Sequence, residues 1–208
     1  AEPKPAQDRP DARPDIVFED WENAQYKDWV IQGRAFGIRP RNLVDIAAYQ
    51  GDLNAQGKWV LNTHETRSGE DVVKGDSHVG TLTSREFTIE RDWIRFRIGG
   101  GNHPGQTCIN LLVDGVLVRT ETGRDNNRMR LDHWNVKELA GKKGTIQIVD
   151  NSTGAWGNVG IDEIVFTDVE RLENYDIERA PDFGTMAMGT AGAARCRIGG
   201  AEWDTVGK

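Results

Sequence analysis

The sequence predicts an all-β protein, an antiparallel β-sandwich. From residue 80 to residue 166, short runs rich in β-branched and aromatic residues recur between turns of Gly, Asn and Asp, a spacing typical of sandwiches. In residues 93–98 (WIRFRI), apolar and arginine side chains alternate, as in a strand with one buried face. Asp114 and Gly115 separate two apolar runs and predict a tight two-residue hairpin turn, because both tolerate positive φ angles.

Ahead of this region the predicted elements are shorter. Residues 1–15 hold four prolines among charged residues, which predicts an extended leader with nothing apolar to bury. Apolar runs at residues 16–18 and 29–31 predict two short strands with a turn between them. The irregular stretch that follows has an apolar run at residues 43–49, which suits either a brief helix or a covering loop.

The remaining segments complete the predicted module. Residues 58–62 (KWVLN) alternate as a strand, and residues 64–78 are polar enough to form a loop. Residues 134–139 (WNVKEL) end before a glycine and predict a single helical turn that crosses the sandwich.

The amino-acid composition changes after residue 166. Residues 167–183 are rich in charge, and residues 184–208 are rich in Gly and Ala with little periodicity. We therefore expect a leader at residues 1–15, one sandwich module at residues 16–168, and a tail at residues 169–208. The tail would serve as a linker or as the start of a following domain.

Composition narrows the function classes. The 208 residues carry 26 Lys and Arg against 33 Asp and Glu, a net charge of −7, which disfavours nucleic acid as a partner. The sequence lacks the run of about 18 apolar residues that a membrane helix needs. Cys108 and Cys196 lie too far apart in sequence to indicate a disulfide framework.

The polar, Pro-rich start without Met fits a cleaved signal peptide or a trimmed chain, and we expect a secreted or periplasmic protein.

Several motifs together resemble one family of modules. They are found at residues 80–84 (GTLTS), 98–105 (IGGGNHPG), 107–115 (TCINLLVDG) and 148–162, and residues 18–37 resemble the family's opening motif. The family consists of β-sandwich accessory modules in secreted bacterial glycoside hydrolases, including levanase-type and invertase-type enzymes and planctomycete-type relatives. The resemblance covers residues 16–168 and implies a noncatalytic jelly roll of the galactose-binding-domain type.

This chain departs from the family pattern at one loop. Ala155 stands where the family usually has a second Gly before Trp156, and Asn158 stands where it has His. A binding site at that loop would therefore differ in detail from that of the family.

The best candidate for a binding loop is residues 150–158 (DNSTGAWGN), in which an indole lies between glycines. Sugar rings pack their C–H groups on aromatic faces, and their hydroxyls bind planar acceptors and donors. His103, after the glycine run 99–101, could also approach a ligand closely, to hydrogen-bond a sugar hydroxyl or bind a metal. The structural alternatives are a strained turn at the glycines and a Trp156 that fills the rim of the core.

Two strand arginines, Arg97 and Arg119, could grip hydroxyls or a carboxylate from a sheet face, or could form ordinary surface ion pairs. The predicted sugar-contact set therefore combines strand and loop side chains: Arg97, His103, Arg119, Asp150, Asn151, Trp156 and Asn158.

A structural calcium ion is a second hypothesis. Glu19 opens the sandwich and Asp162 closes it, and first and last strands commonly lie side by side, so their carboxylates could share an ion. Jelly rolls that resemble this one commonly carry such a bridging ion. The alternative is a pair of strand-end acids in water.

Signals for catalysis are weak. The four histidines show neither HExxH nor zinc-ligand spacing, and the sequence contains no GxSxG motif. We expect a noncatalytic module that binds a polysaccharide or oligosaccharide and works beside a catalytic domain of the same protein. The alternatives are a module that packs on a neighbouring domain without binding sugar, and a fragment of a larger glycoside hydrolase.

Overall fold

A computed structural model describes residues 13–64, 72–170, 194–198 and 201–205. The chain divides into two compact units, Ala1–Glu170 and Arg171–Lys208. In the second unit, β13 (Ala194–Ile198) and β14 (Ala201–Thr205) form an antiparallel hairpin. Most of the predicted leader, part of the predicted loop at residues 64–78 and most of the predicted tail lie outside the described residues.

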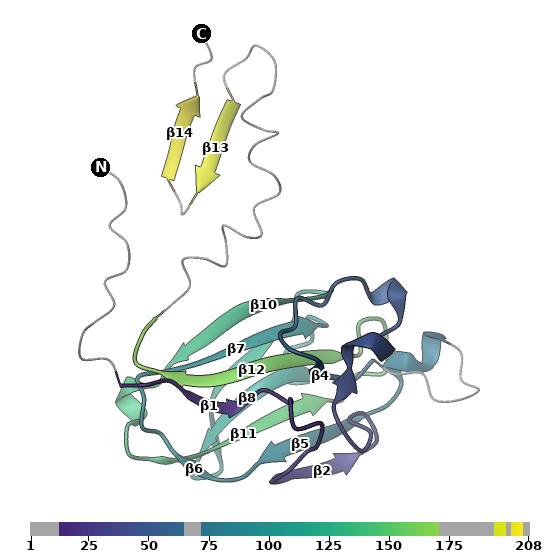
Figure 1. The fold of residues 1–208 in the computed structure, drawn as a ribbon, viewed down its shortest axis with the longest axis horizontal. Helices are drawn as coiled ribbons and strands as arrows, with labels where there is room; N and C mark the ends of the chain where they lie inside the picture. Colours follow the sequence, from purple (N-terminus) through teal and green to yellow (C-terminus); the bar gives the residue numbers. More distant parts are fainter. Residues whose placement is uncertain (1–12, 65–71, 171–193, 199–200, 206–208) are drawn as a thin grey trace. The chain divides into compact units, whose positions relative to one another are not determined.

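The first unit contains two sheets of six strands each, and every strand pairing in them is antiparallel (Figure 1). The first sheet contains β10 (Asn126–Asn135), β7 (Trp93–Gly100), β12 (Val159–Thr167), β4 (Trp59–Asn62) and β3 (Arg41–Asn42) in this order, with β1 (Ile16–Glu19) also on β12. The second contains β2 (Trp29–Gly33), β5 (Gly80–Ser84), β11 (Lys143–Asp150), β8 (Thr107–Val113) and β9 (Val116–Thr122), with β6 (Phe87–Thr88) also on β11. The prediction of an all-β antiparallel sandwich is confirmed.

Local patterns predicted the central strands well. Asp114 and Gly115 have φ angles of 52° and 77° and connect β8 to β9, with Val113 paired to Val116. In β7 the apolar side chains at alternate positions are almost fully buried, and the arginines between them are half-buried on the other face. The hairpin and the alternation follow from backbone chemistry that a short window contains.

Outside the central strands, one predicted element is changed, the helical turn at residues 134–139. The two short strands predicted near the N-terminus are present but do not pair with each other: β1 joins β12 in the first sheet and β2 joins β5 in the second. Trp134 belongs to strand β10, and only Lys137–Leu139 (η4) forms a 3-10 turn. The apolar run at residues 43–49 contributes to two 3-10 turns, η1 (Leu43–Asp45) and η2 (Ala48–Gln50). A further 3-10 helix, η3, spans Val72–Asp76.

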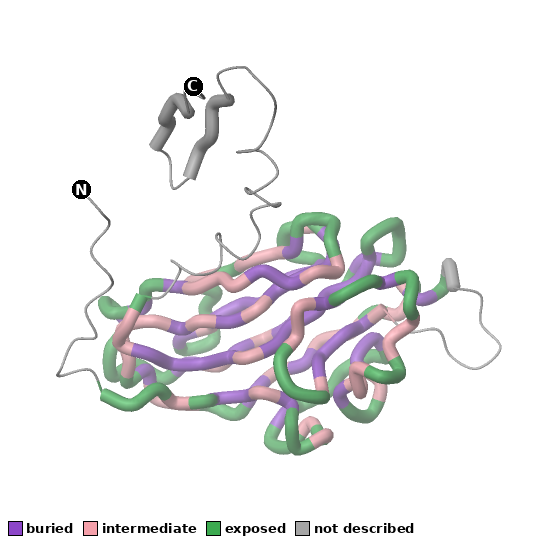
Figure 2. The backbone as a smooth tube through the Cα atoms, turned by 45° about the horizontal axis from the view of Figure 1, so that its top comes forward, coloured by how far each residue is buried: buried purple, intermediate pink, exposed green. Residues whose placement is uncertain are grey.

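The main core lies between the two sheets, and buried positions alternate along the strands (Figure 2). A second small cluster forms on the outer face of the first sheet. Leu61 points into the main core, so its neighbour Val60 points outward, where it packs with Leu53 and Met129. The segment between β3 and β4 is thereby held against the outside of the sandwich.

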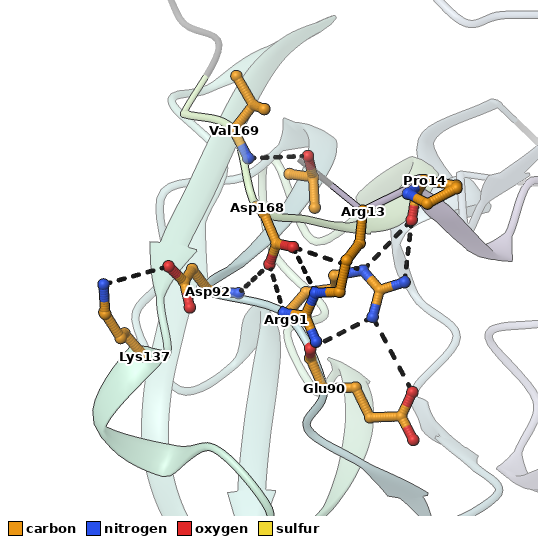
Figure 3. A network of polar contacts seen from close by, with 9 residues as sticks. Arg13, Pro14, Glu90, Arg91, Asp92, Lys137, Asp168 and Val169 are labelled. Carbon is orange, nitrogen blue, oxygen red and sulfur yellow. Dashed lines mark hydrogen bonds and ion pairs between the residues drawn. The ribbon is translucent and has the colours of Figure 1, made fainter. Parts of the chain in front are cut away.

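A polar network fastens the two ends of the sandwich chain to each other (Figure 3). The Arg13 guanidinium donates to both carboxylate oxygens of Asp168, at 2.7 and 2.8 Å. Asp168 also accepts from the backbone amide of Asp92, whose carboxylate lies 3.4 Å from the Lys137 ammonium. The Arg13 hydrogen bond holds the pKa of Asp168 below its usual range.

Candidate functional site

The structure brings part of the predicted binding loop together with the glycine run. The His103 ring nitrogen Nε2 lies 3.0 Å from the carbonyl oxygen of Ala155, and the Gly101 amide donates to the carbonyl of Asn158 at 2.9 Å. A Cβ at Gly101 would meet the Trp156 carbonyl oxygen at 1.9 Å, so only glycine permits this backbone approach. His103, Trp156 and Asn158 therefore lie at one end of the sandwich.

The side chains of this loop differ in accessibility. Trp156 has a φ of 60° and is 38% exposed, so its indole does not fill the core. Asn158 is buried and its amide donates to Asn127 Oδ1 at 3.1 Å. Asn151 is exposed, and its backbone amide bonds the Gln106 carbonyl at 2.7 Å. Of the predicted contact residues in this loop, Trp156 and Asn151 are thus those that a ligand could reach directly.

Asp150 lies beneath the loop instead of on its surface. It ends β11 with only 1% of its surface exposed, and neither carboxylate oxygen accepts a hydrogen bond of normal geometry. Burial raises the pKa of Asp150 to about 7, and nearby Thr63 and the Ser152 amide offset this only in part. Asp150 is therefore not placed for direct contact with a surface-bound sugar.

The two predicted strand arginines lie apart from the loop and from each other. Arg97, on β7 of the first sheet, donates to Glu163 Oε2 at 2.6 Å. Arg119, on β9 of the second sheet, bonds the Asn135 carbonyl at 2.9 Å and pairs with Glu138. Both arginines thus take protein partners, and the predicted sugar-contact set does not form one surface.

The predicted calcium ligands lie on neighbouring strands but have separate partners. Both Glu19 oxygens accept N–H bonds, from the Trp21 amide at 3.0 Å and from the Trp29 indole at 2.8 Å. The Asp162 oxygens accept from the amides of Gln56 at 2.7 Å and Glu163 at 2.9 Å. N–H donors present positive charge to these oxygens, so this donor set does not suit a shared cation.

Burial also changes the acidity of these two carboxyl groups. It raises the pKa of Glu19 above its usual value and that of Asp162 to about 7. Among the described residues, no group of three or more His, Cys, Asp and Glu side chains has the arrangement of a metal site. A calcium ion at Glu19 and Asp162 remains a prediction from the sequence.

A cleft of about 320 Å³ opens beside β3 and β4, and none of its lining residues belongs to the predicted sugar-contact or calcium sets. Its lining combines an indole with charged and amide side chains: Gly37, Ile38, Arg39, Pro40, Arg41, Asn42, Asp45 and Trp59. The Arg39 guanidinium lies 5.6 Å from the centroid of the Trp59 ring. This is the arrangement of a cation–π contact.

The elements around the cleft position Trp59 firmly. Its backbone amide donates to Glu22 Oε1 at 2.8 Å, and Asn42 pairs with it across the β3–β4 ladder. One part of the indole packs against the main core while the rest lines the cleft. Asn42 Oδ1 accepts from the Val44 amide and caps η1, which fixes the wall that carries Asp45.

Sequence reasoning missed this cleft, because residues 37–45 have no periodic pattern and their place opposite Trp59 depends on the β3–β4 pairing. The available signal was compositional. Two arginines, an asparagine and an aspartate occur within seven residues of an irregular stretch, Arg39 to Asp45.

Comparisons with known proteins add a distant relative. No family model matches the chain. The chain is 28% identical over 174 residues to a protein of Aspergillus rugulosus named "Putative glycosyl hydrolase ecdE". The match covers 81% of this chain but 23% of that protein, so the chain spans about a quarter of its relative's length.

Solved structures with a related β-sandwich include carbohydrate-binding modules. TmCBM61, in complex with β-1,4-galactotriose, is 19% identical, covers 71% of this chain and 94% of its own, and has a TM-score of 0.40. A family 29 module complexed with cellulohexaose is 13% identical, covers 74% and 91%, and has a TM-score of 0.38. A cyclase from Fischerella sp. TAU is 12% identical, covers 76% and 100%, and has a TM-score of 0.44. In the described part of this chain, none of the helices has the length and apolarity to cross a membrane.

Proposed function

We propose that the sandwich binds carbohydrate in the Trp59 cleft and serves as a noncatalytic accessory module of a secreted glycoside hydrolase. The observation that carries this proposal is the lining of the cleft, where one indole faces guanidinium, amide and carboxylate side chains. Its ligand is an oligosaccharide or one segment of a polysaccharide.

The chemistry of the cleft suits a sugar ring. The indole of Trp59 offers an apolar face for the C–H groups of the ring, while Arg41, Asn42 and Asp45 offer donors and acceptors for hydroxyls. Small-molecule sites commonly occupy about 300 to 1,000 Å³, and this cleft lies at the lower end of that range. A site for one or two sugar units, with weak affinity, is the expected result.

The distant relative supports the accessory role. The match covers only 23% of a protein whose name describes a glycosyl hydrolase, which leaves most of that protein for other domains. In such an arrangement, a weak sugar site raises the local concentration of the glycan around the catalytic domain.

A second function is favoured by two exposed apolar side chains near the cleft. Ile38, which lines the cleft, is 89% exposed, and Val44 is 85% exposed. Neighbouring exposed apolar residues are typical of surfaces that pack against another domain. The alternative is therefore a module that docks on its catalytic domain through this region and binds no sugar.

The test is a glycan array followed by calorimetry on the full chain. Fructans, galactans and β-glucans would be screened, and each hit would be measured with the wild type, Asp45→Ala, Trp59→Ala and Trp156→Ala. We expect Trp59→Ala and Asp45→Ala to weaken binding at least tenfold, since a lost stacking contact or hydrogen bond costs about 1 to 2 kcal/mol. Trp156→Ala should leave the affinity within about twofold.

The variants separate the possible outcomes. Asp45 is exposed, so its substitution removes a cleft side chain without disturbing the core and guards against misfolding of the Trp59 variant. Binding that is lost in Trp156→Ala but kept in Asp45→Ala would move the site to the loop of residues 150–158. An array without any hit would contradict sugar binding and favour the docking alternative.

A further inference from the structure

Arg39 brings a positive charge into the Trp59 cleft. The residue is exposed, and its guanidinium lies 5.6 Å from the centroid of the Trp59 ring. Most arginines of the described residues form ion pairs with carboxylates: Arg13, Arg91, Arg95, Arg97, Arg119, Arg128 and Arg130. Arg39 has no such pair with any Asp or Glu in the described part of the chain. Its charge is therefore available to a ligand.

The acidic side chains around the cleft do not cancel this charge. Glu22 directs Oε1 to the backbone amide of Trp59, at 2.8 Å, so part of its charge is used by the main chain. Asp45 is the one carboxylate among the described residues that line the cleft, and Arg39 and Arg41 line it as well. The lining thus carries two guanidinium groups against one carboxylate, although the net charge of the whole chain is −7.

The backbone limits where the Arg39 side chain begins. Pro40 follows Arg39 and is buried, and a proline restricts both its own φ and the conformation of the residue before it. Arg41 then pairs with Val60 in the β3–β4 ladder, next to Trp59. The main chain at Arg39 is thus already ordered, which lowers the entropy that binding would cost.

An arginine that lies over an indole keeps its hydrogen-bond donors available. The contact is an attraction between the positive charge and the electrons of the ring, and it does not require the N–H groups. A guanidinium has five N–H donors in a planar arrangement that matches the two oxygens of a carboxylate. The ring itself suits the C–H groups of a sugar. Together, the two side chains match a sugar ring that carries a carboxylate.

We propose that the Trp59 cleft binds an acidic glycan, with the carboxylate of a uronic acid residue on Arg39 and the ring of that residue on Trp59. This inference rests on the proposed sugar-binding function and names its substrate class. The carboxylate draws the guanidinium toward itself, and the indole face that the guanidinium leaves takes the sugar ring. Arg41 adds positive charge to the same lining, and Asn42 and Asp45 serve the hydroxyls.

The experiment is calorimetry on the full chain with short oligomers of galacturonic acid and of mannuronic acid. Methyl esters of the same oligomers are the matched ligands, because they keep the sugar and its linkage but lose the charge. A sulfated galactan oligomer tests a second kind of anion. The wild type, Arg39→Gln, Arg39→Lys and Arg124→Gln would be compared at low and high salt. Arg124→Gln is the control, because it makes the same change at an exposed arginine between β9 and β10, outside the cleft.

We expect the wild type and Arg124→Gln to bind a uronate oligomer at least tenfold more tightly than its methyl ester at low salt, since charge-assisted hydrogen bonds are about twice as strong as neutral ones. Arg39→Gln should lose at least tenfold in affinity for the uronate. Arg39→Lys should lose less, because lysine keeps the charge but not the planar pair of donors. High salt should reduce the preference for the acid, because it screens exposed charges.

The outcomes separate this inference from the function on which it rests. Equal affinity for acid and ester would overturn the acidic ligand and leave sugar binding in the cleft intact, as would binding of neutral glycans alone. A preference for the acid that survives in Arg39→Gln would also overturn it, because the carboxylate would then bind elsewhere. Tighter binding of the sulfated oligomer than of both uronates would overturn the uronic acid assignment in favour of a sulfate ester. Failure of every acidic and neutral glycan to bind would contradict the sugar-binding function itself.

Discussion

Two aspartates, Asp150 on β11 and Asp162 on β12, have the same burial and very different surroundings. Their exposed fractions are 1% and 0%, and burial raises the pKa of each to about 7. Asp162 accepts backbone N–H bonds on both oxygens, whereas the oxygens of Asp150 have no hydrogen-bond partner. By burial and pKa alone the two aspartates would have the same role. Only their hydrogen bonds distinguish them.

The difference assigns to Asp162, and not to Asp150, the role of holding a loop in place. Through the Gln56 amide, Asp162 fastens the loop after Leu53 to the outside of the first sheet. That loop covers the small cluster of Leu53, Val60 and Met129. Asp150 accepts no hydrogen bond of normal geometry that would hold another segment in place.

The pH dependence of stability is the largest effect that both aspartates share. Their pKa values rise from 3.8 unfolded to about 7 folded, so the folded state binds more protons between these values. The free energy of unfolding should therefore be highest near pH 4 and fall as the pH rises to about 7, by at most about 4 kcal/mol for each group. Urea unfolding with chelator at pH 4.5, 6 and 7.5 measures the slope. A stability that rises over this range would contradict the buried, protonated state.

Alanine substitutions test the hydrogen bonds directly. Asp162→Ala leaves the Gln56 and Glu163 amides without acceptors and should lower the free energy of unfolding by about 2 to 4 kcal/mol. Asp150→Ala removes the same atoms but breaks no such bond, so in chelator we expect a loss below about 1 kcal/mol. Urea unfolding at pH 5.5 would compare them. Equal losses would mean that cavity formation, and not hydrogen bonding, sets the cost of substitution at both sites.

Gly157→Ala tests the close approach of the two segments beside Asp150. The new methyl group would meet the Ser152 and Asp76 carbonyl oxygens at 2.5 and 2.9 Å, so the loop must move. We expect a loss of about 1 to 3 kcal/mol in thermal or urea unfolding. Gly154→Ala in the same loop is the control, because its Cβ would have no neighbour within 4 Å. Similar losses in the two variants would indicate that the segments are further apart.

The smallest effect is expected beside Asp162. Arg97 lowers the pKa of Asp162 and pairs with Glu163 at 2.6 Å, but the Glu163 side chain is 34% exposed. Partly exposed ion pairs contribute little, so Arg97→Gln should cost less than about 1 kcal/mol and shift the pH profile slightly upward. A loss of more than 2 kcal/mol in the free energy of unfolding would show that the Arg97–Glu163 ion pair, and not the amide hydrogen bonds, keeps Asp162 in place.

Sequence patterns predicted the fold more fully than the site. The alternation in β7 and the turn at Asp114 and Gly115 each depend on a few neighbouring residues, and both are confirmed. His103 and the loop of residues 150–158 were predicted separately as candidates for sugar contact, and it is the structure that places the His103 ring on the Ala155 carbonyl. Arg97 and Arg119 could not be assigned from the sequence, because their partners Glu163 and Glu138 depend on sheet order.

By itself, the sequence determined the class of the protein: the repeated short strands, their inward faces and the tight hairpin, all of which arise from backbone geometry and local hydrophobic alternation. Only the tertiary structure decided which polar groups meet. It placed Trp59 opposite residues 37–45, gave Asp162 two amide donors, and buried Asp150 without a hydrogen bond of normal geometry. These contacts join residues that are far apart in the chain, and strand order and register, which no local pattern contains, bring them together.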